Sequence, residues 1–576
     1  MSKKLTALLL AAIMTLSLAA ACGNKAPAET PTQPTTPAPT TPGETPTTPA
    51  PTQPADPNAE KYGGTMRIGH ANAPTSMDPH YSTTLGDEQW YYHVYESLAC
   101  GDANGKYYGV LAKYEVSEDS LVHTYTLRDD RYFSNGDKVT MEDVEASIRR
   151  KIAKSISTES SAKNWLMDCT FEFTDTQLIV TLAKPNVKFQ TSFNSGTFCV
   201  MPKEICEKYP FTGGTELPNG MFYGAEIEQI NTLDDVIGSG PYTMTKFTDN
   251  ADIVLTKNQA YIPVTEGNED AIGIGAPRMG YLDEIIFCLN LDSASRTAAL
   301  IAHEYDTGTG AAAMKENIIA AGVEVVDAGT TWTHGIFFNL HESNADSPIA
   351  DVNVRKAIRA AIDVEEVMLA ICGGDASRVN LDPYAVRNET VYASTKMEDS
   401  GEWNVHDLDK AKAYLAQSSY NGEPIVYLTH TSGAFYTAAM VVIPQLEAIG
   451  LNVELMAVEN SSHGALRKDP ATGHDIGCWE VQKNTENPVL HSTFVTGTQG
   501  WWTTDARNAA VNKMLNAPTG SAESIAAYEE YLDAVIEECP YILFGHPTGL
   551  TYQWPGVDRG QAGQTRFYYW NAYFKD

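Results

Sequence analysis

Cysteine is scarce in this chain, and the few cysteines are widely spaced. The 576 residues include nine, and no two of them form a Cys-x-x-Cys pair. This spacing indicates neither a structural zinc site nor a dense disulfide framework. Cys199 and Cys206 could close a small loop, which the sequence leaves open, and most of the others are expected to be small buried side chains.

Basic residues and long apolar runs are also few. The chain has 40 lysines and arginines against 73 aspartates and glutamates, a formal net charge of -33. Such an acidic balance argues against nucleic acid and anionic lipid surfaces as partners. After Cys22 no apolar run reaches the length of about eighteen residues that a membrane-spanning helix needs.

The common catalytic motifs are missing as well. There is no His-Glu-x-x-His, no Gly-x-Ser-x-Gly and no Walker-type glycine-rich loop. Gly308-Thr309-Gly310 follows an acidic turn instead of a strand, which argues against dinucleotide binding. We therefore predict that the protein is not an enzyme and needs no cofactor. An exported hydrolase, the alternative, would require a nucleophile and a base that no motif supplies.

The first residues have the layout of an export signal. Lys3 and Lys4 precede the apolar run of residues 5–18, which is too short for a comfortable membrane span. The run closes on Ala19-Ala20-Ala21-Cys22, which resembles the lipobox of bacterial lipoproteins, although that family usually has leucine where this chain has Ala19. The resemblance implies a lipid on Cys22 that anchors the protein to the outer face of the cytoplasmic membrane. An ordinary secretory signal with an incidental cysteine is the alternative.

A proline-rich segment follows this signal. Residues 26–57 hold eleven of the 30 prolines, interleaved with threonine and alanine, and no aromatic or large aliphatic residue. Because such a segment cannot bury apolar surface, residues 23–62 are expected to form a disordered tether, about 120 Å long if largely polyproline-like. The globular part would then stand clear of its lipid anchor.

Strand-like and helix-like segments alternate after the tether, which is typical of an α/β protein. The apolar run 285–289 predicts a strand that is covered on both faces. Thr140 and Asp363 are predicted to cap the beginnings of two helices. A strand at 425–428, a helix at 435–449 and a strand at 452–458 predict a crossover between parallel strands, with a kink at Pro444.

Several blocks, taken in order, resemble the peptide/nickel-type family of extracytoplasmic solute-binding proteins that serve ABC importers. The first is Gly63-Gly64-Thr65-Met66-Arg67-Ile68 with Pro74-Thr75-Ser76-Met77-Asp78-Pro79-His80, and the others are residues 94–98, 125–144, 238–242, 281–285, 338–339 and 354–363. Each block alone is weak evidence. In this order, over nearly the whole chain after Tyr62, they are strong evidence.

This resemblance implies an α/β, two-lobed periplasmic-binding-protein-like fold of type II with an additional third domain. Lobe I would be discontinuous and comprise residues 63–100, 235–325 and 540–576. The extra domain would comprise residues 101–234, and lobe II residues 326–539. The solute would be enclosed in the cleft between the lobes.

The resemblance also implies two ligand-binding segments. In peptide-binding members the ligand lies extended and pairs with protein backbone like an added strand. The segments that match here are Ala73-Pro74-Thr75-Ser76 and Gly477-Cys478-Trp479-Glu480 with the residues that follow. Trp479 is predicted to line the pocket. Trp501, Trp502 and Tyr91 are further candidates for its wall, with core packing as the alternative.

The residue that would hold the amino terminus of a peptide differs from the family pattern. Peptide binders have an aspartate there, but counting back from Pro488 gives Asn484, and counting forward from Trp479 gives Gln482. A charge-assisted hydrogen bond is about twice as strong as a neutral one, so the difference matters. Either Glu480 or Glu486 takes over, or the ligand has no free amine there, or another carboxylate reaches the site.

We predict a monomeric, lipid-anchored receptor that captures a small solute, foremost a di- or oligopeptide, and delivers it to the permease of an ABC importer. A nickel-chelate or oligosaccharide receptor of the same family is the alternative. Some relatives carry chelated nickel, for which His80, His93, His463 or His491 could serve here. No dedicated metal site is expected.

Overall fold

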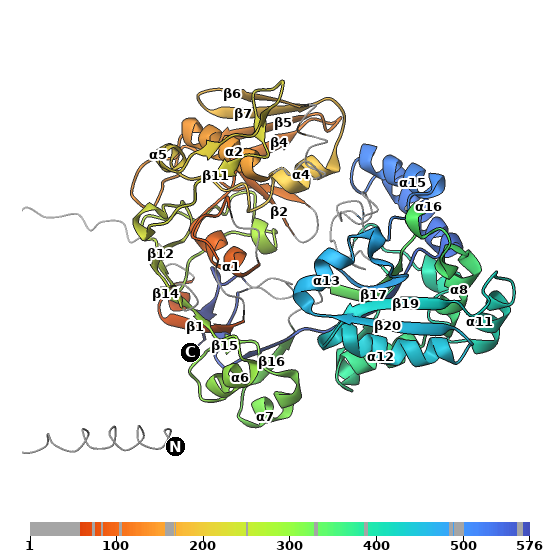
Figure 1. Ribbon diagram of the computed structural model, residues 1–576. Helices are drawn as coiled ribbons and strands as arrows, with labels where there is room; N and C mark the ends of the chain where they lie inside the picture. The colour runs from red at the N-terminus through yellow and green to blue at the C-terminus, as the bar shows by residue number, and fades with distance from the viewer. Residues whose placement is uncertain are drawn as a thin grey trace, which may run out of the picture. The chain divides into compact units, whose positions relative to one another are not determined.

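Three main sheets organise the chain (Figure 1). The computed structural model describes residues 58–71, 75–81, 85–102, 106–155, 166, 169–248, 252–327, 332–384, 390–482, 488, 500–560 and 568–575. The expected signal, the anchor at Cys22 and residues 23–57 of the tether lie outside these described residues. No helix within them is long and apolar enough to cross a membrane.

A seven-stranded sheet collects strands from distant parts of the chain. Its order is β12-β13-β14-β1-β15-β23-β16, and β1 runs parallel to both β14 and β15. The strands are β12 (Tyr242–Phe247), β13 (Ile253–Lys257), β14 (Glu284–Leu289), β1 (Thr65–His70), β15 (Thr307–Gly308), β23 (Leu550–Gln553) and β16 (Glu324–Asp327). Its helices are α1 (Leu85–Val94), α6 (Ser293–Ile301) and α7 (Lys315–Ala320).

Strand β14 confirms the predicted strand but not its predicted burial. Ile285 and Phe287 are buried, whereas Ile286 and Cys288 are only half-buried. The prediction of a strand covered on both faces was wrong, because an apolar run records side-chain type and not what packs above each face.

A four-stranded antiparallel sheet follows the order β4-β5-β7-β6. Its strands are β4 (Ala112–Val116), β5 (Val122–Leu127), β7 (Gln177–Leu182) and β6 (Cys169–Phe173), and the helices are α2 (Met141–Ser155), α4 (Val187–Phe193) and α5 (Lys203–Lys208). Helix α2 begins after Thr140, as predicted. The Asp143 N–H donates to the Thr140 hydroxyl at 3.4 Å, and the Thr140 N–H donates back to the Asp143 carboxylate at 2.8 Å.

Short two-stranded ribbons complete the strands of the described residues. They are β2 (Ala99–Gly101) with β3 (Tyr107–Gly109), β8 (Phe211–Thr212) with β11 (Glu226–Ile227), β9 (Thr215–Glu216) with β10 (Phe222–Tyr223), and β24 (Val557–Asp558) with β25 (Tyr573–Phe574). Asn571 ties the C-terminal segment to the chain before β14, since its side chain accepts the Met279 N–H and donates to the Pro277 carbonyl, both at 2.8 Å.

The six-stranded sheet has the order β18-β22-β17-β21-β19-β20. The strands are β18 (Val379–Leu381), β22 (Tyr541–Pro547), β17 (Trp332–Phe338), β21 (Ile476–Gln482), β19 (Pro424–His430) and β20 (Asn452–Val458). The helices are α8 (Val352–Ala361), α9 (Val364–Ile371), α10 (Lys396–Asp399), α11 (Leu408–Leu415), α12 (Gly433–Glu447), α13 (Asn460–Leu466), α15 (Asp505–Asn516) and α16 (Ala522–Glu538). We call this sheet with its helices lobe II.

Lobe II confirms the predicted strand-helix-strand unit and the predicted helix restart. Strands β19 and β20 are parallel and joined through α12, which contains Pro444. Asp363 caps α9 by accepting the Glu366 N–H at 2.9 Å. One face of the sheet packs on α8, α9 and α12, and the other carries a second core with side chains from α15 and α16.

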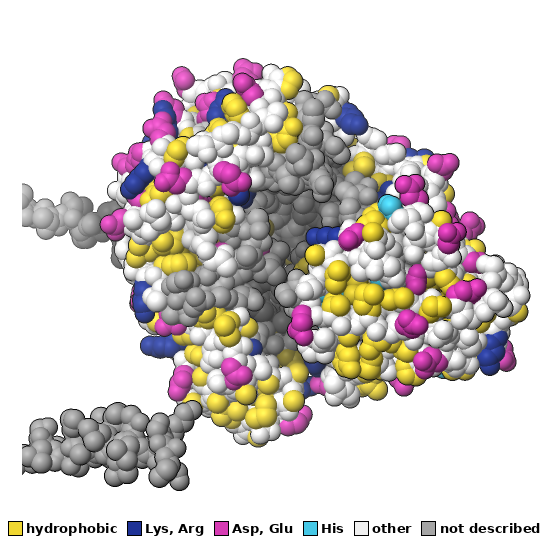
Figure 2. Space-filling model, in the orientation of Figure 1, with side chains coloured by type: hydrophobic (Ala, Val, Ile, Leu, Met, Phe, Trp, Pro, Cys, Tyr) yellow, Lys and Arg dark blue, Asp and Glu magenta, His cyan; other side chains and the backbone are white. Residues whose placement is uncertain are grey.

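The chain passes between the seven-stranded and six-stranded sheets twice, from β16 to β17 and from β22 to β23. Near these crossings Lys315 of α7 forms an ion pair with Asp375, at 2.8 Å. The α/β class and the two-lobed architecture agree with the prediction, while the residue at which each domain begins and ends stays a prediction. Acidic side chains are spread over the face that Figure 2 shows.

Candidate ligand-binding site

Thr75 and Ser76 belong to the ligand-binding segment predicted before Asp78. The other two residues of that segment, Ala73 and Pro74, lie outside the described residues. Asp87 of α1 accepts the Thr75 N–H at 2.8 Å and the Ser76 N–H at 3.4 Å, and also the Thr75 hydroxyl. The Ser76 hydroxyl accepts the Asp78 N–H at 3.0 Å. These bonds within the protein hold Thr75 and Ser76 in position, which lowers the entropy cost of binding a ligand there.

The second predicted segment lies on strand β21, and one of its edges is largely open. Strand β17 pairs with all seven residues of β21, from Phe338 opposite Ile476 to Trp332 opposite Gln482. On the other edge, β19 pairs only with Ile476 and Gly477. Within the described part of the chain, no strand therefore pairs with residues 478–482 on that edge, although the Cys478 thiol still contacts Thr429 and His430 at the end of β19. Such an edge can accept an extended ligand as a further strand.

The side chains of β21 alternate between the two faces of the sheet. Trp479 and Val481 belong to the core on the α15 and α16 side, and the Trp479 ring lies 5.5 Å from that of Tyr541. Cys478 and Glu480 point to the opposite face, where α13 lies. Trp479 is 1% exposed, so its ring serves the core of lobe II in this structure.

Glu480 is a partly buried carboxylate at the open edge. Burial raises its pKa above the usual value, and the nearby positive charge of Arg467 opposes that rise. His334 of β17 stands directly opposite Glu480 in the register. Asn484 and Glu486, the other predicted candidates, lie outside the described residues, and of Gln482 only the backbone is described.

Histidines surround the same face of β21. The Cys478 thiol lies 3.1 Å from Nε2 of His463, and the His463 ring lies 4.3 Å from that of His430. Burial raises the pKa of Cys478 to about 12 and lowers that of His463 to about 4, so both are neutral at neutral pH. Sequence reasoning missed His334, His430 and Arg467, because only the strand register and the position of α13 bring them beside Cys478 and Glu480.

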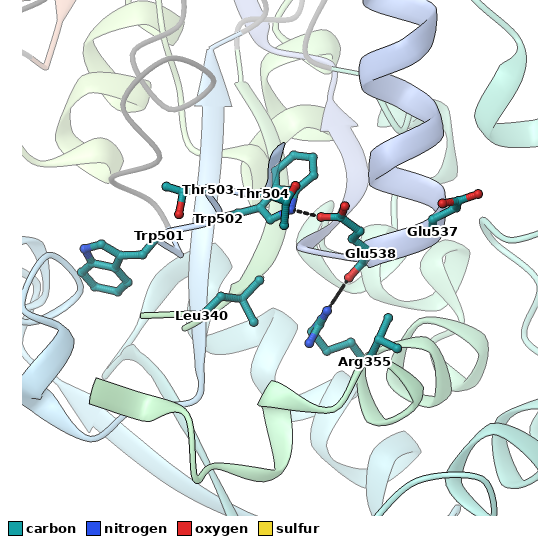
Figure 3. A pocket seen from close by; sticks show the side chains of 9 residues that line it. Leu340, Arg355, Trp501, Trp502, Thr503, Thr504, Glu537 and Glu538 are labelled. Carbon is teal, nitrogen blue, oxygen red and sulfur yellow. Dashed lines mark hydrogen bonds between the residues drawn. The ribbon is translucent and has the colours of Figure 1, made fainter. Parts of the chain in front are cut away.

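Trp501 and Trp502 line a pocket of about 410 Å³ elsewhere in lobe II (Figure 3). Trp502 is buried, its indole N–H donates to Glu538, and its ring lies 5.5 Å from that of Tyr531. Trp501 is half-buried and has φ of 53°. The pocket lies near Leu340, beyond the end of β17 that is far from Glu480. The two tryptophans therefore do not belong to the open edge of β21.

The other predicted candidates occupy structural positions. Tyr91 is fully buried in the core beneath the seven-stranded sheet. Nε2 of His80 lies 2.9 Å from the Cys199 carbonyl, and Nε2 of His93 accepts the Tyr569 N–H at 2.9 Å. His491 lies outside the described residues. Among the residues that the structure covers, no three His, Cys, Asp or Glu side chains are arranged to hold a metal ion.

Comparison with known proteins relates the chain to bacterial binding proteins. Residues 106–522 match the family described as bacterial extracellular solute-binding proteins, family 5 Middle. A probable peptide ABC transporter periplasmic-binding protein of Sinorhizobium fredii is 24% identical over 457 residues, which cover 75% of this chain and 77% of the relative. The dipeptide-binding protein DppE of Bacillus subtilis is 20% identical over 419 residues, which cover 68% of this chain and 70% of DppE.

A solved structure supports the same assignment at the level of the fold. The ABC transporter-associated periplasmic binding protein DppA of Helicobacter pylori, in complex with the peptide STSA, matches with a TM-score of 0.65 and 19% identity over 90% of this chain and 99% of DppA. Since the family match spans more than half of the sequence, the chain belongs to the bacterial extracellular solute-binding proteins of family 5, which bind solutes for ABC transporters and are not enzymes.

Proposed function

We propose that this protein captures a di- or oligopeptide and delivers it to the permease of an ABC importer. The observation that carries this proposal is the open edge of β21, where residues 478–482 pair with no strand among the described residues. An extended peptide can donate and accept backbone hydrogen bonds along that edge whatever its side chains are. The Thr75-Ser76 segment would hold the peptide from lobe I.

Backbone pairing alone gives too little affinity. A hydrogen bond contributes about 1 kcal/mol net, whereas a Kd of 1 μM corresponds to about 8 kcal/mol. A short edge therefore needs a further contact with a group that peptides have and other solutes of this size lack. The charged amino terminus supplies it, because a charge-assisted bond in a partly buried site is about twice as strong as a neutral one.

Glu480 is our candidate for the partner of that ammonium group. It is on the strand that offers the open edge, and it is half-buried. Burial destabilises its charged form when no ligand is present, as the raised pKa indicates. A bound ammonium would relieve this cost. Glu486 is the alternative anchor, within a stretch of the chain that the structure does not describe.

The remaining parts of the proposal concern the cell surface. Cys22 would carry lipid, and residues 23–62 would tether a monomeric receptor to the outer face of the membrane. The three-domain division at about residues 63–100, 101–234, 235–325, 326–539 and 540–576 also belongs to the proposal, except that β22 pairs within the sheet of lobe II and moves the last boundary beyond Pro547. Replacing Cys22 by Ala should release the protein from the membrane fraction and abolish its labelling by a fatty-acid probe. Membrane retention of that variant would contradict the lipid anchor.

A thermal-shift screen tests the ligand class. A ligand that binds only the folded state at 100 times its Kd stabilises it by about 2.7 kcal/mol, which raises Tm. Peptides with a free amino terminus should raise Tm, and the same peptides Nα-acetylated should do so much less. Nickel chelates and oligosaccharides, the alternative ligand classes, are tested in the same screen. A shift with one of these and with no peptide would overturn the peptide proposal while leaving the family assignment intact.

A further inference from the structure

A second pocket in lobe II lies beyond the end of β17 that is far from Glu480. Leu340, two residues beyond β17, lines this pocket, whereas His334 near the beginning of β17 faces Glu480. Six residues of extended chain span about 20 Å. At about 410 Å³ the pocket is large enough for a small organic molecule.

Aromatic rings and carboxylates line this pocket together (Figure 3). Trp501 and Trp502 contribute indole rings, and Glu537 and Glu538 come from the last turn of α16. Glu537 is exposed, and Glu538 is half-buried and accepts the Trp502 indole N–H. Indole faces and carboxylates both attract cations, and neither attracts anions.

The two carboxylates are in an unfavourable place for the helix itself. Helix α16 runs from Ala522 to Glu538 and has no basic residue in its last turn. Its C-terminal end carries the negative pole of the helix dipole, at which acidic side chains are destabilising. The N–H that Glu538 accepts from Trp502 offsets part of this cost, and a bound cation would offset more of it.

Arg355, a cation that lines the pocket, forms no ion pair with these carboxylates, although its charge attracts that of Glu538. Its Nε donates to the carbonyls of Glu538 and Cys539 at 3.1 Å, and Nη1 and Nη2 donate to carbonyls at 2.7 to 2.9 Å. Its guanidinium thus binds backbone at the end of α16. Among the described residues, no Lys or Arg forms an ion pair with Glu537 or Glu538.

We propose that this pocket is a second binding site, for an organic cation that carries an ammonium group on an aliphatic stem. The stem would pack on Trp502 and Leu340, and the ammonium would lie beside Glu538 at the negative end of α16, with the charge of Glu537 nearby. The backbone of Trp501 supports a binding role, because a φ of 53° is costly for tryptophan and such strain concentrates at functional sites.

The probe for this proposal is 1,5-diaminopentane, with 1,5-pentanediol as its uncharged counterpart of the same length. The readout is the indole N–H resonances of the full chain labelled with ¹⁵N-tryptophan, where Trp501→Phe and Trp502→Phe assign the two signals. The diamine at about 10 mM should shift these signals, and the diol should not. Absence of a shift, or equal shifts with both compounds, would overturn the proposal.

Charge-neutral variants complete the experiment. Glu538→Gln keeps an acceptor for the Trp502 N–H, so the double variant Glu537→Gln, Glu538→Gln removes charge and preserves that contact. It should weaken diamine binding at least about tenfold. The matched control is Glu523→Gln, in the first turn of the same helix, which should leave binding unchanged. If the double variant does not fold, Glu537→Gln alone, at an exposed residue, should still weaken binding. Unchanged affinity in a folded variant would refute the site.

Peptide binding at β21 should be unaffected in every variant, so this proposal and the peptide proposal can fail separately.

Discussion

Arg150 of α2 and Asp78 form a buried two-point ion pair. The guanidinium Nη1 and Nη2 donate to the two carboxylate oxygens at 3.0 and 2.5 Å, and the side chains are 2% and 0% exposed. Ile230 N–H donates to the same carboxylate at 3.1 Å, and Arg150 Nε donates to the Tyr209 carbonyl at 2.8 Å. Both charges therefore have the additional partners that a buried pair needs. The pair joins the Thr75-Ser76 segment to α2.

Removing one charge of this pair should destabilise the fold strongly. Asp78→Asn leaves the Arg150 charge buried without a counter-charge, which costs about 3–5 kcal/mol. The partly exposed pair Arg149 and Glu145, on the same helix, provides the control. Glu145→Gln should cost no more than about 1 kcal/mol. Urea unfolding measures both, and equal effects of the two substitutions would contradict the account.

The same pair should make stability depend on pH in the acid range. Burial would raise the pKa of Asp78, but the hydrogen bonds and charge of Arg150 outweigh burial and lower it below the usual 3.8. A carboxyl with a lowered pKa in the folded state stabilises the fold fully above its unfolded pKa. That stabilisation is lost as pH falls from 3.8 through the folded pKa. Urea unfolding from about pH 6 to about pH 3 should show this loss, and Asp78→Asn should lack this part of it.

Glu480 should control peptide affinity if it binds the amino terminus. Glu480→Gln should weaken binding of a free-amine peptide at least about tenfold, or about 1.4 kcal/mol, and leave an Nα-acetylated peptide unaffected. Isothermal titration calorimetry measures both. The matched control is Glu454→Gln, at an exposed residue of β20. Equal affinities in the Glu480 variant and the parent would remove Glu480 from the site and leave Glu486 to be tested.

The affinity for free-amine peptides should also fall on acidification. Only the charged form of Glu480 attracts an ammonium group, and burial raises the pKa of this carboxyl in the free protein above 4.5. Affinity should therefore decrease as pH falls, beginning at a higher pH than for an ordinary glutamate. Calorimetric titrations across this range should show no such decrease for Glu480→Gln.

The cysteines should behave as free thiols. Cys199 and Cys206, which the sequence allowed to pair, are free and buried, and burial raises the pKa of each to about 12. Of the eight cysteines in the described residues, Cys288 alone is partly exposed. Alkylation of the native protein followed by peptide mapping should modify Cys288 first. A disulfide-linked peptide containing Cys199 and Cys206 would contradict the structure.

Much of the fold could be predicted from local patterns. The caps at Thr140 and Asp363 and the parallel unit of β19, α12 and β20 depend on residues close in sequence, so the sequence reveals them. The two-lobed architecture could be predicted because family blocks recur in order along the chain. The partial exposure of β14 could not be predicted, since it depends on what packs against the second face of the sheet.

The site was less predictable than the fold. The segment around Cys478 could be located by resemblance. The direction in which its side chains point could not be predicted, because a strand's register decides which residues share a face. Trp479 therefore turns to the α15 and α16 side while Glu480 turns to α13. Aromatic character alone suggests that Trp501 and Trp502 line the peptide site, whereas the structure places them on a pocket beyond the end of β17.

Hydrogen-deuterium exchange of β21 with and without a peptide tests the central claim most directly. A peptide that adds as a strand should protect backbone amides of residues 478–482 that face the open edge, while those bonded to β17 should change much less. The Nα-acetylated peptide should give weaker protection at the same concentration. Saturating peptide that raises Tm but leaves every amide of residues 478–482 unprotected would contradict the claim that this edge binds the ligand.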